Sequence, residues 1–129
     1  MRGPPSISIG QGRGLNHFTK SKTSRIMKAI EKIIENGQKV LVRTEKAGVF
    51  YGVVAEFENN TAEIRNCRRI WYWDGAASLS ELSETGPKTP RNCKFSVTVS
   101  SIVVMGVKEG IPCTEAASKA IEEVPVWRA

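Results

Sequence analysis

Histidine is scarce in this sequence, because His17 is the only one among 129 residues. Histidine is the commonest general base at neutral pH, so its scarcity argues against a histidine-based hydrolase and a histidine-rich metal site. A glycine-rich phosphate loop followed by Lys and Ser or Thr is missing as well. We therefore expect a protein that is not an enzyme and that holds no metal or cofactor.

Long apolar runs are missing too. No stretch of about 18 apolar residues occurs, which predicts that the chain does not span a membrane. The first thirty residues also lack the apolar stretch of a secretory signal. We expect the protein to stay in the cytoplasm of the cell that makes it, with no membrane partner.

Cysteines are few, odd in number and widely spaced. The three residues Cys67, Cys93 and Cys113 are separated by 26 and 20 positions. These separations fit neither a disulfide framework nor a zinc site. We expect three reduced cysteines that behave as small buried hydrophobic residues.

Acidic residues are missing from the first thirty positions, although the whole chain has 19 Lys and Arg against 13 Asp and Glu. Gly and Pro are dense at the start, so residues 1–22 are predicted to form a flexible basic arm. This arm could follow a phosphate backbone or lie across a neighbouring subunit, and the sequence leaves both open. The basic residues of the region are Arg2, Arg13, Lys20, Lys22, Arg25 and Lys28.

Hydrophobic spacing predicts the elements of a single domain over residues 23–129. Apolar residues three and four apart indicate a helix from Thr23 to the Asn36-Gly37 stop. A short helix within residues 76–85 and a last helix over residues 115–123, capped by Thr114, are also expected. Strands are predicted over residues 39–44, 49–57, 61–66, 94–99 and 102–107, before Gly110-Pro112 breaks the sheet.

Two details favour a small barrel. Gly52 lies within a predicted strand, where glycine is expected only if the strand turns a sharp corner. Asn59-Asn60 tolerates positive φ and predicts a tight hairpin turn. The fold class is thus mostly β with flanking helices (α+β), with a short helix in an inserted segment, residues 68–92.

Arginines and aromatic rings gather within nine residues of the chain. Arginine can hold phosphate through two parallel hydrogen bonds and aromatic rings stack on bases, so this segment predicts binding of nucleic acid or a nucleotide. Strand alternation would place Arg69, Trp71 and Trp73 on one face, and would place on the other face Arg68, Ile70 and Tyr72. The alternative is that the tryptophans fill the barrel or a subunit interface. The candidate ligand-binding residues are Arg65, Arg68, Arg69, Trp71, Tyr72 and Trp73.

A strand glycine, Gly52, is followed by Phe57, Glu58 and Asn66 at a spacing that resembles the first motif of the Sm-like family of Hfq and Lsm proteins. Residues 97–104 look like the closing strand pair of that family. The resemblance implies an SH3/Sm-like small β-barrel that assembles into a homo-oligomeric ring and binds RNA. The chain departs from the family in having serines where the second motif carries basic or Arg-Gly residues, and in the inserted segment.

Two uncommon runs, Arg-Arg-Ile-Trp-Tyr-Trp at residues 68–73 and Gly-Ala-Ala-Ser-Leu-Ser at residues 75–80, are similar to a family of small bacteriophage proteins. That resemblance covers residues 39–127 and implies a phage origin, with the protein in the cytoplasm of the infected bacterial host or in the virion. Three functions follow as hypotheses. The chain binds nucleic acid or a nucleotide, or serves as a capsid or tail accessory protein that contacts virion proteins, or sequesters a nucleotide signal of host defence.

Overall fold

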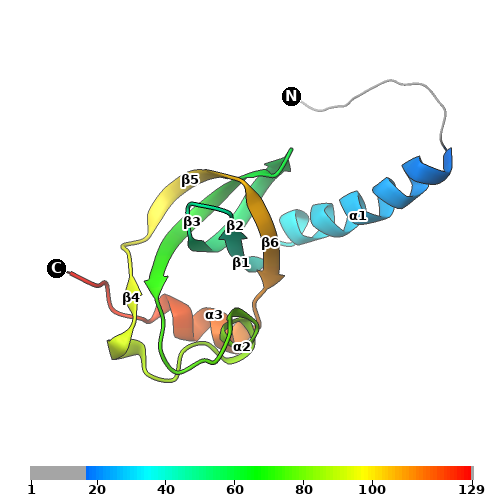
Figure 1. Cartoon of the computed structure of the whole chain (residues 1–129). Helices are drawn as coiled ribbons and strands as arrows, with labels where there is room; N and C mark the ends of the chain where they lie inside the picture. The colour runs from blue at the N-terminus through cyan, green and yellow to red at the C-terminus, as the bar shows by residue number, and fades with distance from the viewer. Residues whose placement is uncertain (1–16, 129) are drawn as a thin grey trace. The chain divides into compact units, whose positions relative to one another are not determined.

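The computed structural model describes the backbone of residues 17–128 and the side chains of residues 25–128 (Figure 1). It confirms the predicted fold class, mostly β with flanking helices, and its curved sheet is compatible with a small barrel. In chain order the elements are α1 (His17–Glu35), β1 (Lys39–Thr44), β2 (Val49–Glu58), β3 (Thr61–Tyr72), α2 (Leu79–Thr85), a 3₁₀ turn (Pro90–Asn92), β4 (Lys94–Phe95), β5 (Val99–Met105), β6 (Val107–Pro112) and α3 (Glu115–Glu122).

The strands of the described residues form one antiparallel sheet in the order β4-β3-β2-β1-β6, and β5 also pairs with β3. The first half of β3 pairs with β5 and its end pairs with β4. β5 and β6 are joined only by Gly106, whose φ is 75°. The carbonyl of Gly106 accepts from the amide of Glu45, and the amide of Val107 donates to Asn60. The curved sheet therefore brings β5, which pairs with β3, next to β6, which pairs with β1, at this corner.

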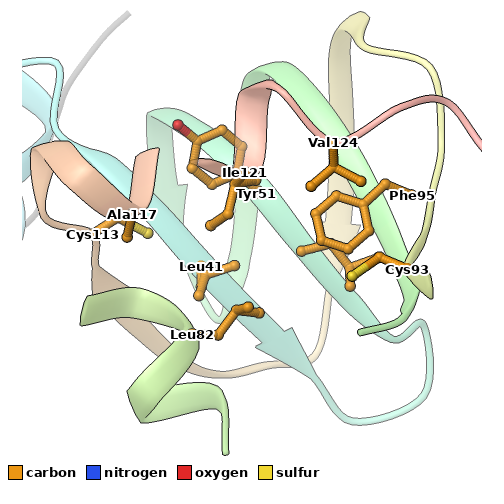
Figure 2. Close-up of a cluster of buried hydrophobic side chains, with 10 residues drawn as sticks. Leu41, Tyr51, Leu82, Cys93, Phe95, Cys113, Ala117, Ile121 and Val124 are labelled. Carbon is orange, nitrogen blue, oxygen red and sulfur yellow. The ribbon is translucent and has the colours of Figure 1, made fainter. Parts of the chain in front are cut away.

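Buried side chains occupy both faces of the sheet, so β1 alternates between two clusters: Leu41 faces one, Val40 and Val42 the other. The first cluster lies between the sheet and helices α2 and α3, which run side by side (Figures 1 and 2). The second is enclosed by β1, β2, β3 and β5, and consists of Val40, Val42, Phe50, Val54, Ala62, Ile64, Cys67 and Val104.

The hairpin and the strand glycine follow the prediction. Asn59 and Asn60 have φ values of 51° and 59°, as a tight turn between twisted strands requires. A Cβ atom on Gly52 would lie 2.7 Å from the carbonyl oxygen of Arg65, and the β2–β3 pairing shifts register there. Only glycine allows this close approach, so the pairing of β2 with β3 requires a glycine at position 52.

Helix α1 is longer than predicted, because it begins at His17 rather than Thr23. The sequence contains no Gly or Pro between residues 15 and 36, so nothing interrupts the helix on that side. It ends where Gly37 adopts a φ of 63° and its amide donates to Ile34. Residues 1–16 of the basic arm, with Arg2 and Arg13, lie outside the described residues.

The chain divides after Glu31 into two compact units. The last turn of α1 belongs to the second unit, where Ile33 and Ile34 pack against the cluster enclosed by the strands. Helix α3 begins after its cap Thr114 as predicted, whereas α2 begins at Leu79, three residues inside the predicted segment 76–85. The Ser78 hydroxyl accepts from the amide of Glu81 at the start of α2, and Thr114 accepts from Ala117 at the start of α3.

Several predicted boundaries are wrong, and the runs predicted over residues 94–99 and 102–107 are instead three strands, β4, β5 and β6. β3 continues to Tyr72, so the segment outside the sheet begins at Trp73 rather than at residue 68. Gly110-Pro112 does not break the sheet, because both residues lie in β6 and pair with β1. Proline lacks a backbone N–H but is accepted here because Pro112 is the last residue of an edge strand.

Candidate nucleic-acid interface

Arg68 comes from β3 and points into the protein, with only 3% of its surface exposed. Its Nε donates to the carbonyl of Ser96 at 2.8 Å, and its Nη1 donates to the carbonyls of Ile121 (2.9 Å) and Val124 (2.8 Å). The guanidinium also lies 5.2 Å from the centre of the Phe95 ring. Burial lowers the pKa of Arg68. These contacts make Arg68 a residue that ties β3 to the end of α3, out of reach of a surface ligand.

Trp73 is half-buried and packs against the cluster between the sheet and the helices. Its Nε1 donates to the carbonyl oxygen of Ala76 at 3.2 Å. The ring therefore holds the start of the inserted segment against the core, and this matches the packing alternative rather than the ligand-binding one.

Arg65 and Arg69 occupy different environments on β3. Arg65 is exposed, with its Nε 3.2 Å from a Glu63 carboxylate oxygen. The hydroxyl of Ser101 and then Arg65 lower the pKa of Glu63 through hydrogen bonds. Arg69 is half-buried, and its guanidinium lies 5.0 Å from the centre of the Phe50 ring. Both keep part of their surface for contact with a ligand.

The predicted alternation holds along β3 only as far as Trp71. Ile70 is buried and Trp71 is exposed, but Tyr72 is also 50% exposed and Trp73 turns inward. The prediction is wrong for the last two residues because the β3–β4 pairing shifts register between Ile70 and Tyr72, where the strand ends. A register shift moves each following side chain to the other face.

Two exposed tryptophans from distant parts of the chain meet beside β4. Trp71 is 55% exposed and Trp127 is 42% exposed. Their ring centres are 5.8 Å apart and their planes are inclined by 70°, an edge-to-face contact. The ammonium of Lys94 lies 5.1 Å from the centre of the Trp127 ring. We call Trp71 and Trp127 the indole pair.

The chain after α3 brings Trp127 to this position. Val126 forms a parallel bridge with Phe95, and the amide of Trp127 donates to the Phe95 carbonyl at 2.9 Å. Figure 1 shows this red tail passing beside β4. Sequence reasoning missed both Trp127 and Lys94, because neither lies near Trp71 in the chain. The aromatic residues themselves were the only signal in the sequence that could have pointed to this site.

The three segments that meet at the indole pair carry charge of one sign. Residues 64–73, 90–98 and 124–128 contain no Asp or Glu. Their basic residues are Arg65, Arg68, Arg69, Arg91, Lys94 and Arg128. Apart from the buried Arg68 and half-buried Arg69, these side chains are exposed. The carboxylates that contact these segments come from just outside them, Glu63 at Arg65 and Asp74 at Asn92.

The cysteines are free and buried, as predicted. Burial raises the pKa of Cys67 to about 11 and that of Cys113 to about 12, so both stay protonated at neutral pH. Among residues 17–128 no cluster of His, Cys, Asp and Glu has the composition of a metal site.

Part of the predicted basic arm lies on α1, where Arg25 and Lys28 are exposed. The side chains of Lys20 and Lys22 lie outside the described residues. No helix in the described part of the chain is long and apolar enough to cross a membrane.

An apolar stripe lies on the outer face of β5. Val99, Val103 and Met105 are 36%, 60% and 71% exposed, and β5 pairs on only one side, with β3. Within the stripe, the Ser101 hydroxyl donates to the Glu63 carboxylate at 2.9 Å. The unpaired edge of β5 and an exposed apolar surface therefore lie next to each other.

The sequence model of one family, the Domain of unknown function (DUF6948), matches residues 37–121. The match covers all strands of the sheet together with α2 and most of α3, and it ends before Trp127. No curated protein matches the sequence.

Proposed function

Since the chain belongs to the DUF6948 family, whose description assigns no activity, we propose its function from its surface: a non-enzymatic protein that binds nucleic acid. The observation that carries the proposal is the exposure of Trp71 and Tyr72 at the end of β3. Large aromatic rings are costly to leave in water, and they stack on bases of any sequence.

Charge supports the same conclusion. The segments around the indole pair are basic, and the excess charge of the whole chain, +6, arises from residues 1–30. Binding to a phosphate backbone through Lys and Arg releases counterions, so the affinity should fall steeply with salt. Arg69 and Lys94 would supply contacts near the rings, Arg65 would supply one farther along β3, and the basic arm would supply further contacts to the backbone.

Light scattering of the purified protein, with the ultraviolet absorbance ratio recorded on the same peak, tests this function. We expect protein purified at low salt to carry nucleic-acid absorbance that a high-salt wash removes. Protein free of such absorbance that also fails to bind added oligonucleotides would overturn the proposal. Retention of a mononucleotide alone would favour the anti-defence hypothesis instead.

A second function, assembly with other subunits, is favoured by the stripe on β5. An exposed strand edge with apolar side chains tends to pair with another chain. We propose a homo-oligomer of Sm-like barrels, encoded by a phage and active in the infected cell or within the virion. A single-chain mass at micromolar concentration would contradict it, whereas a larger mass that Val103→Glu reduces would support it. Recovery of the protein in purified phage particles would favour the virion role.

A further inference from the structure

We propose that the indole pair and Lys94 form a binding site for unpaired bases, so that the ligand is single-stranded nucleic acid and the C-terminal tail supplies half of the site. This inference rests on the proposed function and makes it more specific. It assigns a role to Trp127 and Lys94, which lie in segments that sequence reasoning did not connect.

The ring geometry leaves a surface for stacking. An edge-to-face contact uses the edge of one ring and the face of the other. If Trp71 offers its edge, both of its faces stay clear of this contact, and if it offers a face, the opposite face stays clear. In either arrangement Trp71 keeps at least one face, in agreement with its 55% exposure.

The positions of the two rings are fixed by the fold. Trp71 lies near the end of β3, a strand paired with β2, β4 and β5. Trp127 is held at the edge of β4 by the hydrogen bond of its amide to Phe95. Arg68 anchors the start of the tail from inside, through the carbonyl of Val124. A pre-positioned ring loses little conformational entropy when a base stacks on it.

Positive charge completes the site. Lys94 lies beside Trp127, and its side chain is exposed. Arg128 follows Trp127 directly and Arg91 precedes β4, and both are exposed. A base stacked on an indole brings its phosphate within a few ångströms of the ring, where these cations can neutralise it.

Stacking of this kind selects single strands. In a duplex both faces of each base are already covered by neighbouring bases, so the protein cannot stack on them and is left with contacts to the phosphates, sugars and groove edges. A single strand offers free base faces, and stacking on an aromatic side chain strengthens binding appreciably. The indole pair therefore predicts a preference for single strands that charge alone would not produce.

The test compares a fluorescein-labelled oligo(dT) of about 15 nucleotides with a duplex of the same length, by anisotropy at matched salt. We expect the single strand to bind about tenfold or more tightly than the duplex, and indole emission to be quenched on binding. Trp71→Ala and Trp127→Ala should each weaken oligo(dT) binding about tenfold, while duplex binding changes little. Lys94→Ala should weaken both.

A matched control lies away from the indole pair. Lys108→Ala removes an exposed lysine from β6 and should bind oligo(dT) like the wild type. Circular dichroism establishes that each variant is folded, and quenching of the wild-type indoles gives a readout that needs no variant.

The outcomes separate this inference from the proposed function. Equal affinity for single strand and duplex, with Trp71→Ala and Trp127→Ala unchanged, would overturn the single-strand site and leave nucleic-acid binding standing. Binding of neither nucleic acid would overturn both. Weakening by Trp71→Ala alone would overturn the role assigned to the tail.

Discussion

The Nη1 of Arg68 donates a hydrogen bond of 2.8 Å to the carbonyl oxygen of Val124. This contact joins the middle of β3 to the point where the chain leaves α3 and starts toward Trp127. The same nitrogen also donates to the carbonyl of Ile121, at the C-terminal end of α3. One buried side chain therefore holds both the helix end and the base of the tail.

Replacing Arg68 with methionine should destabilise the protein strongly. The variant removes the guanidinium that donates to the carbonyls of Ser96, Ile121 and Val124. Each hydrogen bond from a charged group is worth about 1.5–3 kcal/mol. We expect the free energy of unfolding to fall by about 3 kcal/mol or more, as measured by urea denaturation. Arg65→Met is the control and should cost less than about 1 kcal/mol, because Arg65 makes an exposed ion pair. Equal losses in the two variants would contradict the interior role of Arg68.

The corner at Gly52 should not tolerate a side chain. A Cβ atom there would lie 2.6 Å from Cγ2 of Ile64 and 2.7 Å from the carbonyl of Arg65, so the backbone must move. Gly52→Ala is expected to lower the free energy of unfolding by about 1–3 kcal/mol. Gly110→Ala is the matched change on β6, where the nearest atom is a methyl of Val40 at 3.3 Å. A larger loss in Gly110→Ala than in Gly52→Ala would count against the barrel corner.

Acid should weaken the contact between the sheet and α3. Hydrogen bonds from Lys39 and Tyr51 lower the pKa of Glu122. The ionised carboxylate therefore stabilises the folded state above its ordinary pKa, and this contribution is lost as pH falls through the lowered value. The pair with Lys39 is half-exposed, so the contribution is at most about 1 kcal/mol.

Thermal unfolding at about pH 6 and about pH 3 measures this effect. The difference in Tm between the two conditions should be smaller for Glu122→Gln than for the wild type. Glu123→Gln, at an exposed neighbour, is the control. Its difference in Tm between the two pH values should be closer to that of the wild type. An identical acid response in Glu122→Gln and the wild type would show that Glu122 does not contribute.

Alkaline pH should destabilise the protein through its buried thiols. Burial raises the pKa of Cys67 to about 11, whereas an unfolded thiol titrates near about 8.5. The protonated Cys67 thiol contributes fully to the free energy of unfolding below the pKa of the unfolded thiol. This contribution is lost as pH rises toward the pKa of the folded thiol, at up to about 1.4 kcal/mol per pH unit. Urea denaturation at about pH 8 and about pH 10 should show a smaller decline for Cys67→Ala than for the wild type. An unchanged decline would mean that Cys67 does not contribute.

Much of the fold follows from local pattern. Strand β1 has the predicted bounds, because its alternation and the flanking turn residues determine both ends. The caps at Ser78 and Thr114 are likewise local hydrogen bonds between a hydroxyl and an amide three residues later. The end of β3 was missed because residues 68–72 owe their strand geometry to pairing with β2 and β4, which no local signal encodes.

The candidate site was predictable only in outline. The Arg and Trp segment was found from composition, but the sequence does not show that Arg68 faces the end of α3 while Trp71 faces solvent. Trp127 reaches Trp71 because the tail pairs with β4, a contact across more than fifty residues of chain. Long-range contacts of this kind depend on the tertiary fold and not on spacing.

The measurement that tests the central claim most directly is the salt dependence of nucleic-acid binding by the full chain. A labelled mixed-sequence oligonucleotide is titrated with protein at about 50 mM and about 200 mM salt, and anisotropy gives Kd at each. We predict measurable binding at the lower salt that weakens by at least about tenfold at the higher salt. No binding at the lower salt, or a Kd that does not change with salt, would contradict a function based on phosphate contacts.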